Sequence, residues 1–594
     1  MKIYQWLVAI MLINAWGNTK AQELTTVFEQ SNGTQTVTYE EGISFLEKLH
    51  QKYPNITQFE PIGTTDIGLP LHTFVLSTNG IFQPKTLQEQ KKHILLINNA
   101  IHPGEPDGVD ASLMLLRDIC QDKQKQKLLE NTVIVVIPFY NVDGVINRGK
   151  YSRANQNGPI EYGFRGNAKN LDLNRDFIKL DSKNAQTFTQ IFQKWQPDIY
   201  VENHVSNGAD YQYTFTCLGT QPDKLGGALG EYLKKQLFPD LQKRMEKKKW
   251  DMTHYVNVHG TVPDSGFVQF NDSPRYSSGY AALFHTIALV PETHMLKPFS
   301  DRVKANYDFM MALLEHLSEP NIPIKTIKKQ TEEKYQSQTT QFPLKWQVDK
   351  TTFEWLPFKG YTAQYIESQV TQQPRLFYDR KQPFTKNIKF YNQYKPSLTL
   401  QKPVAYLIPQ AYTQIIERLQ WNGVQMMVLK NNQTLQGSYY YITQFETVKY
   451  PFEGHYLHYN TQVKKMEQTL QTRAGDVLVI MNQTANRYLM ETLEPEATDS
   501  FFNWNFFDAI LQQKEGYSEY VFEDIAATLL QQNPTLAQMF KDKKAQDPDF
   551  AKNAEAQLDF IYKNSPYYEN THMRYPIIRI EQTNTLEEIL NREK

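Results

Sequence analysis

Cysteine is nearly absent from this sequence, with only Cys120 and Cys217 among 594 residues. Two cysteines provide no disulfide framework of the kind that staples small secreted folds. We expect two buried thiols rather than a bridge, so a hydrophobic core must stabilise the fold. The chain is long enough for about two to four domains.

An excess of either charge is also lacking. The chain has 63 Lys and Arg residues against 64 Asp and Glu residues, a formal net charge of −1. Proteins that bind nucleic acid or anionic membranes through a global field carry a marked positive charge. We therefore expect no nucleic-acid partner. With 40% hydrophobic and 21% charged residues, the composition is typical of a soluble globular protein.

Long apolar runs are missing except for a short one near the N-terminus. Lys2 precedes a mostly apolar stretch, 6–15, which polar residues and then Ala21 follow. This order is typical of a secretory signal peptide cleaved near Ala21. The stretch is too short for a stable membrane anchor. We predict a signal peptide at 1–21 and an exported, periplasmic or extracellular protein without stable membrane insertion.

The segment 22–324 alternates predicted strands and helices. Buried strands are expected at 93–98, 132–140, 198–202 and 286–292, and helices at 39–53 and 110–129. Apolar strands separated by helices predict an α/β fold with a mixed, mostly parallel sheet flanked by helices. In such sheets, ligands bind at the carboxyl ends of the strands.

A polar stretch, 325–342, interrupts this alternation, and we interpret it as a linker. The remaining region, 343–594, is predicted to be a mixed α/β accessory domain. It contains a β-rich part at 353–400, a strand–helix–strand pattern at 404–429 and a charged helix at 543–563. It shows no chemical motif, so its role stays open.

His102 and Glu105 stand three residues apart in a turn rich in Gly and Pro, directly after a predicted strand. His204 follows another apolar strand. Two histidines and one glutamate with an open fourth position are typical of a hydrolytic Zn²⁺ site. Either motif alone is weak evidence, because a histidine at a strand end often only caps a carbonyl.

The motifs occur in the order found in zinc metallocarboxypeptidases of the carboxypeptidase A type, and the chain resembles that family over about residues 36–315. The matching elements are His102-Pro103-Gly104-Glu105, Asn141 to Gly144, Asn174-Arg175, His204 and Glu292. The C-terminal half is similar to accessory regions of some exported bacterial members. The resemblance implies a carboxypeptidase-like fold and a peptide or peptide-like substrate.

By this resemblance, His102, Glu105 and His204 bind Zn²⁺, and Glu292 is the general base that acts on a zinc-activated water. Asn174 and Arg175 match the residues that bind the C-terminal carboxylate of the substrate. The planar guanidinium fork of arginine suits this task, because it pairs with both carboxylate oxygens.

Three further roles follow from the same resemblance. Arg153 is placed like the arginine that stabilises the oxyanion, with Arg165 as a competing candidate. Asp172 matches the carboxylate that orients the first zinc-binding histidine. Tyr276 and Tyr280 are candidates for the tyrosine that covers the substrate carboxylate. Neither stands at the family's usual separation from the catalytic glutamate, and a packing role remains equally open for both.

The predicted activity is hydrolysis of the C-terminal peptide bond of peptides. One alternative is a zinc-dependent deacylase or amidase acting on acylated amino acids or cell-wall peptides. Another is an inactive binding protein. The Asn174-Arg175 pair and Glu292 favour the peptidase, because they account for carboxylate binding and for proton transfer.

Overall fold

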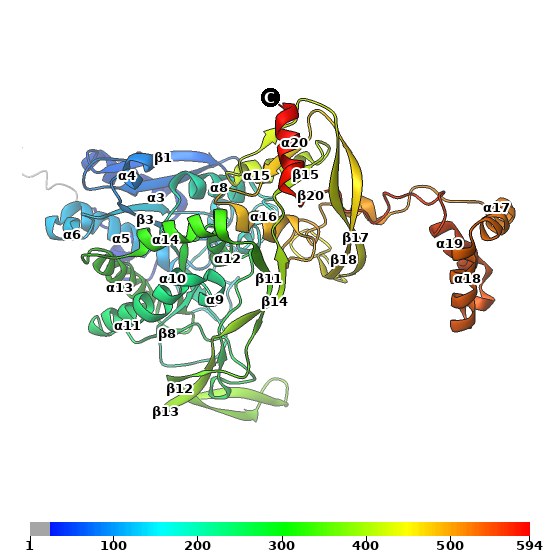
Figure 1. Ribbon diagram of the computed structural model, residues 1–594. Helices are drawn as coiled ribbons and strands as arrows, with labels where there is room; N and C mark the ends of the chain where they lie inside the picture. The colour runs from blue at the N-terminus through cyan, green and yellow to red at the C-terminus, as the bar shows by residue number, and fades with distance from the viewer. Residues whose placement is uncertain (1–23, 594) are drawn as a thin grey trace, which may run out of the picture. The chain divides into compact units, whose positions relative to one another are not determined.

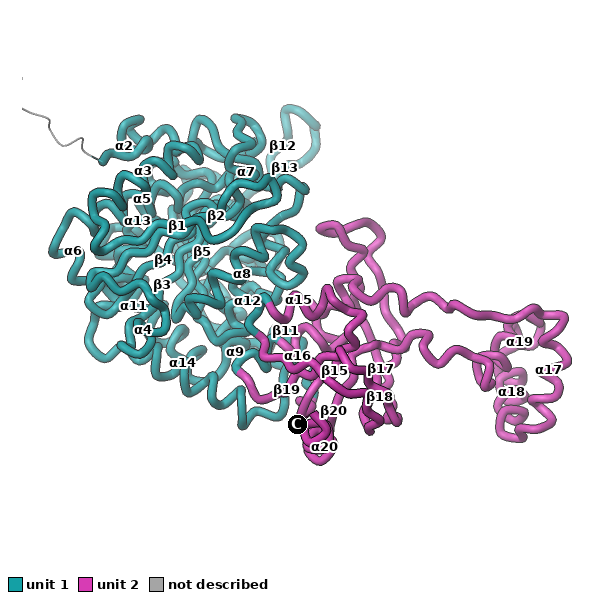
Figure 2. The backbone as a smooth tube through the Cα atoms, turned by 90° about the horizontal axis from the view of Figure 1, so that it is seen from above, with its two compact units in different colours: residues 1–400, 421–423, 484–488 teal, residues 401–420, 424–483, 489–594 magenta. Residues whose placement is uncertain are grey.

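The computed structural model describes residues 24–593, so the predicted signal peptide at 1–21 lies outside the described residues. The chain divides into two compact units, coloured separately in Figure 2. Unit 1 comprises residues 1–400, 421–423 and 484–488, and unit 2 the remainder of 401–594. Both cysteines are buried and free, as expected.

Unit 1 is built on a nine-stranded sheet (Figure 1) with the strand order β1-β2-β4-β3-β5-β10-β7-β8, and with β6 paired to β10. The four central strands β4, β3, β5 and β10 are parallel. β2 joins β4, and β7 joins β10, in antiparallel fashion. The bounds are β1 (Thr57–Thr64), β2 (Pro70–Leu76), β3 (His93–Asn98), β4 (Thr132–Ile137), β5 (Ile199–Glu202), β6 (His204–Ser206), β7 (Phe215–Gly219), β8 (Met252–His254) and β10 (Ile287–His294).

Helices cover both faces of this sheet. Alternate strand residues such as Ile199 and Val201 enter one core with α3 (Tyr39–Lys52), α5 (Asp107–Gln121), α11 (Phe238–Lys247) and α13 (Phe299–Leu317). Tyr200 points the other way and packs on Phe188 and Phe192 of α8 (Lys183–Trp195). α12 (Ser277–Leu283) lies on that second face, where Tyr280 contacts Phe192. The predicted α/β fold with a mixed, helix-flanked sheet is confirmed.

The helix predicted at 110–129 is two helices, because Asp122 interrupts it. Helix α5 ends at the extended backbone of Asp122. The side chain of Asp122 accepts hydrogen bonds from the amides of Gln124 and Lys125 at the start of α6 (Lys123–Lys127). Helix α5 itself begins earlier than expected, at Asp107. The first turn of α5 lies close to Asn203, and only glycine fits at position 108, since a Cβ there would lie 2.2 Å from the Cβ of Asn203.

Asn203 also separates β5 from β6, and β10 pairs with both of these strands. β10 pairs with β5 as far as Leu289, and from Glu292 onward it pairs with β6. His204 and Glu292 are therefore direct partners in the parallel ladder.

The stretch predicted as a linker at 325–342 is mostly helical and belongs to unit 1. It carries most of α14 (Ile324–Glu333) and leads into β11 (Gln341–Val348), which pairs with β14 (Tyr394–Gln401). The hairpin β12 (Glu354–Glu367) and β13 (Pro374–Tyr391) also belongs to this unit. Strand β13 pairs with β9 (Phe267–Val268), and Phe358, Ile388 and Phe390 share a core with Tyr211 and Tyr213. Unit 1 thus runs to about residue 400 rather than 324, because this core ties the hairpin to it.

Unit 2 contains a six-stranded sheet ordered β16-β19-β15-β20-β17-β18. The bounds are β15 (Ala405–Ile408), β16 (Met427–Val428), β17 (Gln433–Thr447), β18 (His458–Thr472), β19 (Val477–Ile480) and β20 (Ile578–Ile580), with α15 (Thr413–Trp421) and α20 (Thr583–Glu593). The strand–helix–strand pattern predicted at 404–429 is present as β15, α15 and β16.

A separate group of helices in unit 2 has its own small core: α17 (Glu519–Gln532), α18 (Pro534–Gln546) and α19 (Ala554–Lys563). The single helix predicted at 543–563 is divided between the last two, because Asn553 caps α19 by accepting from the amide of Ala556. Within residues 24–593, no helix meets the length and apolarity needed to cross a membrane.

Candidate metal and substrate site

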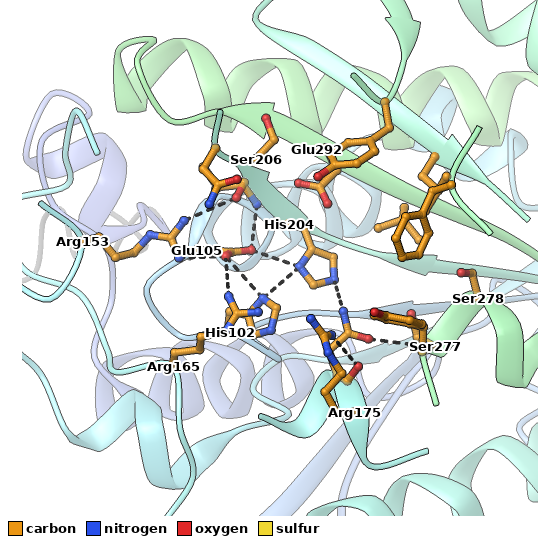
Figure 3. A pocket seen from close by; sticks show the side chains of 18 residues that line it. His102, Glu105, Arg153, Arg165, Arg175, His204, Ser206, Ser277, Ser278 and Glu292 are labelled. Atoms are coloured by element: carbon orange, nitrogen blue, oxygen red, sulfur yellow. Dashed lines mark hydrogen bonds and ion pairs between the residues drawn. The ribbon is translucent and has the colours of Figure 1, made fainter. Parts of the chain in front are cut away.

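His102, Glu105 and His204 converge at the carboxyl ends of β3 and β5 (Figure 3). One ligand atom from each residue lies within 4.8 Å of the others, and all three side chains are buried. The turn that carries the first two is closed by a 2.8 Å hydrogen bond from the amide of Glu105 to the carbonyl of His102. The two Nδ1 atoms are 3.1 Å apart, and the Nδ1 of His204 is 3.0 Å from a carboxylate oxygen of Glu105. The structure thus brings together the three predicted metal ligands.

The far side of each imidazole is held by a carboxylate. The Nε2 of His102 lies 2.9 Å from Asp172, and the Nε2 of His204 lies 3.0 Å from Glu202. With Nε2–H donated to these carboxylates, each neutral ring presents the lone pair of Nδ1 to the centre. Two lone pairs and the carboxylate of Glu105 then face one another without a donor between them. Such a set requires a cation, and its chemistry fits tetrahedral Zn²⁺.

Asp172 was expected beside His102, whereas Glu202 is a residue that the sequence reasoning missed. A carboxylate two positions before a candidate metal-binding histidine is the signal that could have found it. Asp172 also contacts Arg165, at 2.8 Å. His294, which shares a strand with Glu292, does not reach the centre, because its Nε2 donates to the carbonyl of Ala209.

The charges at this centre are strongly coupled. Burial alone would raise the pKa of Glu105, but His102 and Arg153 hold it well below its usual range. Burial alone would lower the pKa of His204, but hydrogen bonds with Glu105 and Glu202 raise it well above its ordinary value. A proton therefore occupies the centre readily when no metal does, and a metal ion must displace it.

Glu292 lies beside the metal ligands and lines the same cavity. Burial raises its pKa to about 8; repulsion from Glu105 adds to this effect, and attraction by His204 and Arg153 opposes it. A dication in the site would lower this pKa. The carboxylate is thus placed to exchange a proton near neutral pH, as a general base must.

Asn174 and Arg175 lie in a short 3-10 turn, Leu173–Arg175, which the Asp172 side chain caps by accepting from the amide of Asn174 at 2.9 Å. The guanidinium of Arg175 lies over the ring of Tyr276, 4.5 Å from its centroid. All three residues line a cavity of about 290 Å³ together with the metal ligands. Stacking holds the guanidinium in place for an anion.

Tyr280 does not line this cavity, so its prediction as a substrate-binding residue is wrong. It is 1% exposed and points from α12 into the aromatic core, where it contacts Phe177 and Phe192. Its hydroxyl donates to Asn422 at 2.7 Å. Burial among aromatic rings leaves this hydroxyl no route to a substrate.

Both candidate arginines line the cavity, and both reach the metal centre. Arg153 contacts Glu105 at 2.8 Å and donates to the carbonyl of Val205 at 3.4 Å. Arg165 lies 3.6 Å from Glu105 and is the more exposed of the two, 45% against 18%. The choice between them for an oxyanion role stays a prediction.

Beyond Glu292 the cavity is lined by Leu218, Val290, Tyr255 and Phe270, which we call the apolar floor. The sequence analysis did not predict it. Val290 lies directly opposite Leu218 in the β10–β7 ladder, on the same face of β10 as Glu292. Tyr255, which directly follows β8, and Phe270 line the cavity beside them. These side chains converge only through pairing of three strands from distant parts of the sequence.

Comparison with known proteins agrees with this geometry. Residues 42–214 match the family model described as zinc carboxypeptidase. This part of unit 1 is similar to zinc carboxypeptidases. The match spans His102, Glu105, His204 and the Asn174–Arg175 pair, whereas Glu292 lies beyond it.

Several carboxypeptidases are similar to the chain. Carboxypeptidase 2 of Trichophyton rubrum is 24% identical over 422 residues, covering 68% of this chain and 72% of the fungal protein. Human carboxypeptidase D is 28% identical over 159 residues, covering 26% of this chain and 10% of its own. Among solved structures, a metallo-carboxypeptidase from Burkholderia cenocepacia (16% identity, TM-score 0.36) covers 47% of this chain and 69% of its own. Carboxypeptidase A from Helicoverpa armigera (14% identity, TM-score 0.35) covers 49% and 73%.

Proposed function

We propose that unit 1 removes the C-terminal residue from peptides by hydrolysis, with Zn²⁺ held by His102, Glu105 and His204. The observation that carries this proposal is the convergence of three acceptor atoms beside Glu292, in one cavity with Arg175. When bound, zinc in such a site lowers the pKa of a water molecule to about 7 and polarises the carbonyl under attack.

The residues of the chain account for the proton transfers. Glu292 is half-buried beside the ligands in the same cavity, so its carboxylate takes a proton from the attacking water and delivers it to the leaving amine. Arg153 and Arg165 bring positive charge to the same wall of the cavity, where negative charge develops on the carbonyl oxygen.

Asn174 and Arg175 give the site its preference for a chain end. A free C-terminal carboxylate pairs with the guanidinium and the amide, whereas an internal peptide bond offers no such anion. This feature favours a carboxypeptidase over a deacylase or a simple binding protein.

The apolar floor indicates which C-terminal residues fit. Leu218, Val290, Tyr255 and Phe270 favour burial of an aliphatic or aromatic side chain. Tyr255 stays neutral, because burial and, to a smaller extent, the negative charge of Glu292 raise the pKa of its hydroxyl well above its ordinary value. We propose that uncharged, apolar C-terminal residues are preferred over charged ones.

The deciding experiment combines zinc analysis with product analysis of a peptide library, using the full chain and its Glu292→Gln variant. We expect about one zinc per chain, release of single C-terminal amino acids by wild type, and release at least about 10²-fold slower by the variant. Cleavage of acyl-amino acids without release from any peptide would instead favour the deacylase alternative. Binding of peptides without any cleavage would favour an inactive binding protein.

We further propose that the protein is exported, with the mature chain beginning near residue 22. The support is the charged, apolar and small-residue pattern of 1–21. Mass spectrometry of the N-terminus of the native protein tests this, and an intact residue 2–20 segment in that protein would contradict it.

A further inference from the structure

Glu202 ends β5 in the interior of unit 1, and its two carboxylate oxygens have different neighbours. One oxygen accepts from the hydroxyl of Tyr200 at 2.7 Å and from the side-chain amide of Asn98 at 3.1 Å. The other accepts from the Nε2–H of His204 at 3.0 Å and from the hydroxyl of Ser277. One oxygen is thus anchored in the sheet, while the other faces the site.

We infer that Glu202 is a positioning residue that orients His204 for the metal and ties it to the residue that binds the substrate carboxylate. This inference rests on the proposed function. It concerns a residue outside the ligand set and outside the five motifs that carry the resemblance to zinc carboxypeptidases.

The first half of this role follows from the hydrogen bond at Nε2. An imidazole on a single Cβ can rotate about χ2 and can carry its proton on either nitrogen. A buried carboxylate at Nε2 fixes the proton there, so the lone pair of Nδ1 faces Glu105 and His102. His102 has the same arrangement through Asp172. The two ligands are therefore oriented by two separate carboxylates.

The second half follows from Ser277. Its hydroxyl donates to Glu202, and its backbone amide donates to the Oδ1 of Asn174 at 3.4 Å. The side-chain amide of Asn174 lies 3.5 Å from the Nε2 of His204. Through Ser277, one carboxylate thereby joins a metal ligand to the carboxylate-binding turn within a single hydrogen-bonded network.

If Glu202 had a purely structural role, hydrogen-bond donors from the sheet would be enough for its carboxylate. Two neutral donors from the sheet already satisfy one oxygen of Glu202. Its other oxygen contacts the Nε2 of His204, which within residues 24–593 has no second carboxylate partner. Burying a charge is costly unless it is paired. His204 and Ser277 provide the hydrogen bonds to the second oxygen, on the side of the metal site.

The test is zinc affinity, measured on metal-free full-length protein by competition with a chromogenic chelator, without any substrate. We expect Glu202→Gln to weaken the Kd for Zn²⁺ about 10- to 100-fold, as loss of such partners does elsewhere. Asp110→Asn is the matched control, because it also changes a fully buried carboxylate of unit 1 to an amide. It should keep the wild-type Kd, since Asp110 does not line the site.

The link to Asn174 is tested with 3-phenylpropionate, a carboxylate with an apolar group, as an inhibitor of zinc-saturated enzyme. We expect Glu202→Gln to raise its Ki several-fold, and Ser277→Ala to raise the Ki while leaving the Kd for Zn²⁺ nearly unchanged. Glu202→Asp keeps the charge on a shorter side chain, and its Kd should fall between those of wild type and Glu202→Gln.

The inference would be overturned if Glu202→Gln kept the wild-type Kd for Zn²⁺ and the wild-type Ki for 3-phenylpropionate. If that variant does not fold, wild-type values of both constants in Glu202→Asp would overturn it. Failure of the proposed function would look different. Wild-type protein would then bind zinc without releasing any amino acid, and the Kd comparison would still report on Glu202.

Discussion

His204 and Glu292 are direct neighbours across the parallel β6–β10 ladder, one as a candidate metal ligand and the other as a candidate base. Because strand pairing fixes this separation, the carboxylate cannot drift from the metal position without breaking the sheet. The register is the same on both sides of Asn203, since Leu289 pairs with Val201 before it and Glu292 pairs with His204 after it.

Replacing Glu292 with Gln should lower kcat about 10²- to 10⁴-fold, the usual contribution of a general base. The amide keeps the size of the side chain but cannot take a proton. Steady-state kinetics on a peptide with an apolar C-terminus measures this, and zinc content should stay at the wild-type value. Glu161→Gln, at an exposed ion pair with Lys150, is the control and should behave as wild type. Full activity of Glu292→Gln would refute the proposed base.

Removal of the metal should abolish peptide hydrolysis, and stoichiometric Zn²⁺ should restore it. Asp172→Asn should weaken zinc binding about 10- to 100-fold by loosening the ring of His102. Equilibrium dialysis with metal analysis gives the affinity. Activity that survives complete chelation would contradict a zinc-dependent mechanism.

Replacing Arg175 with Ala should raise KM for free peptides about 10- to 150-fold, equivalent to the loss of a charged hydrogen bond worth about 1.5–3 kcal/mol. The guanidinium over Tyr276 is the group expected to pair with the terminal carboxylate. Peptides and their C-terminal amides should be compared as substrates. Wild type should discriminate strongly against the amides and the variant only weakly; equal discrimination by both proteins would remove Arg175 from this role.

The floor formed by Leu218 and Val290 should set the side-chain preference. Wild type should release Phe, Leu and Met faster than Lys or Asp, as judged by kcat/KM. Leu218→Asp should reverse part of this preference in favour of Lys and Arg, because it introduces an anion beside the bound side chain. An unchanged ranking in this variant would show that the terminal side chain binds elsewhere.

Asp110 should make unit 1 less stable as the pH rises. Burial raises the pKa of this carboxyl to about 7, from an unfolded value near 3.8. A raised folded pKa means that the stabilisation is complete below about pH 4 and is lost as the pH rises through about 7. The loss is on the order of 4 kcal/mol at most.

Asp110→Asn cannot ionise, so its Tm should exceed that of wild type increasingly between pH 4 and 7, with a constant difference above that range. Calorimetry of both proteins at several pH values measures this. A difference that does not vary with pH would show that Asp110 does not titrate in this way.

Much of unit 1 could be predicted from sequence because its strands are strongly apolar and short. The run at 93–98 matches β3, and the strand predicted at 132–140 is present as β4, which ends three residues earlier at Ile137. Both could be found because a fully buried strand needs an unbroken apolar run. The helix boundaries at Asp122 and Asn553 were harder to predict, because a capping side chain can begin a new helix without changing the apolar pattern.

The sequence by itself determined the candidate ligands, because His102, Glu105 and His204 follow apolar strands in the order found in zinc carboxypeptidases. It also indicated the Asn174–Arg175 pair and Glu292. Only the tertiary structure decided that Glu202 supports His204, that Tyr280 lies in the core and that Leu218, Val290 and Tyr255 form one floor. The floor joins residues far apart in the chain, where strand register rather than local pattern sets which side chains meet.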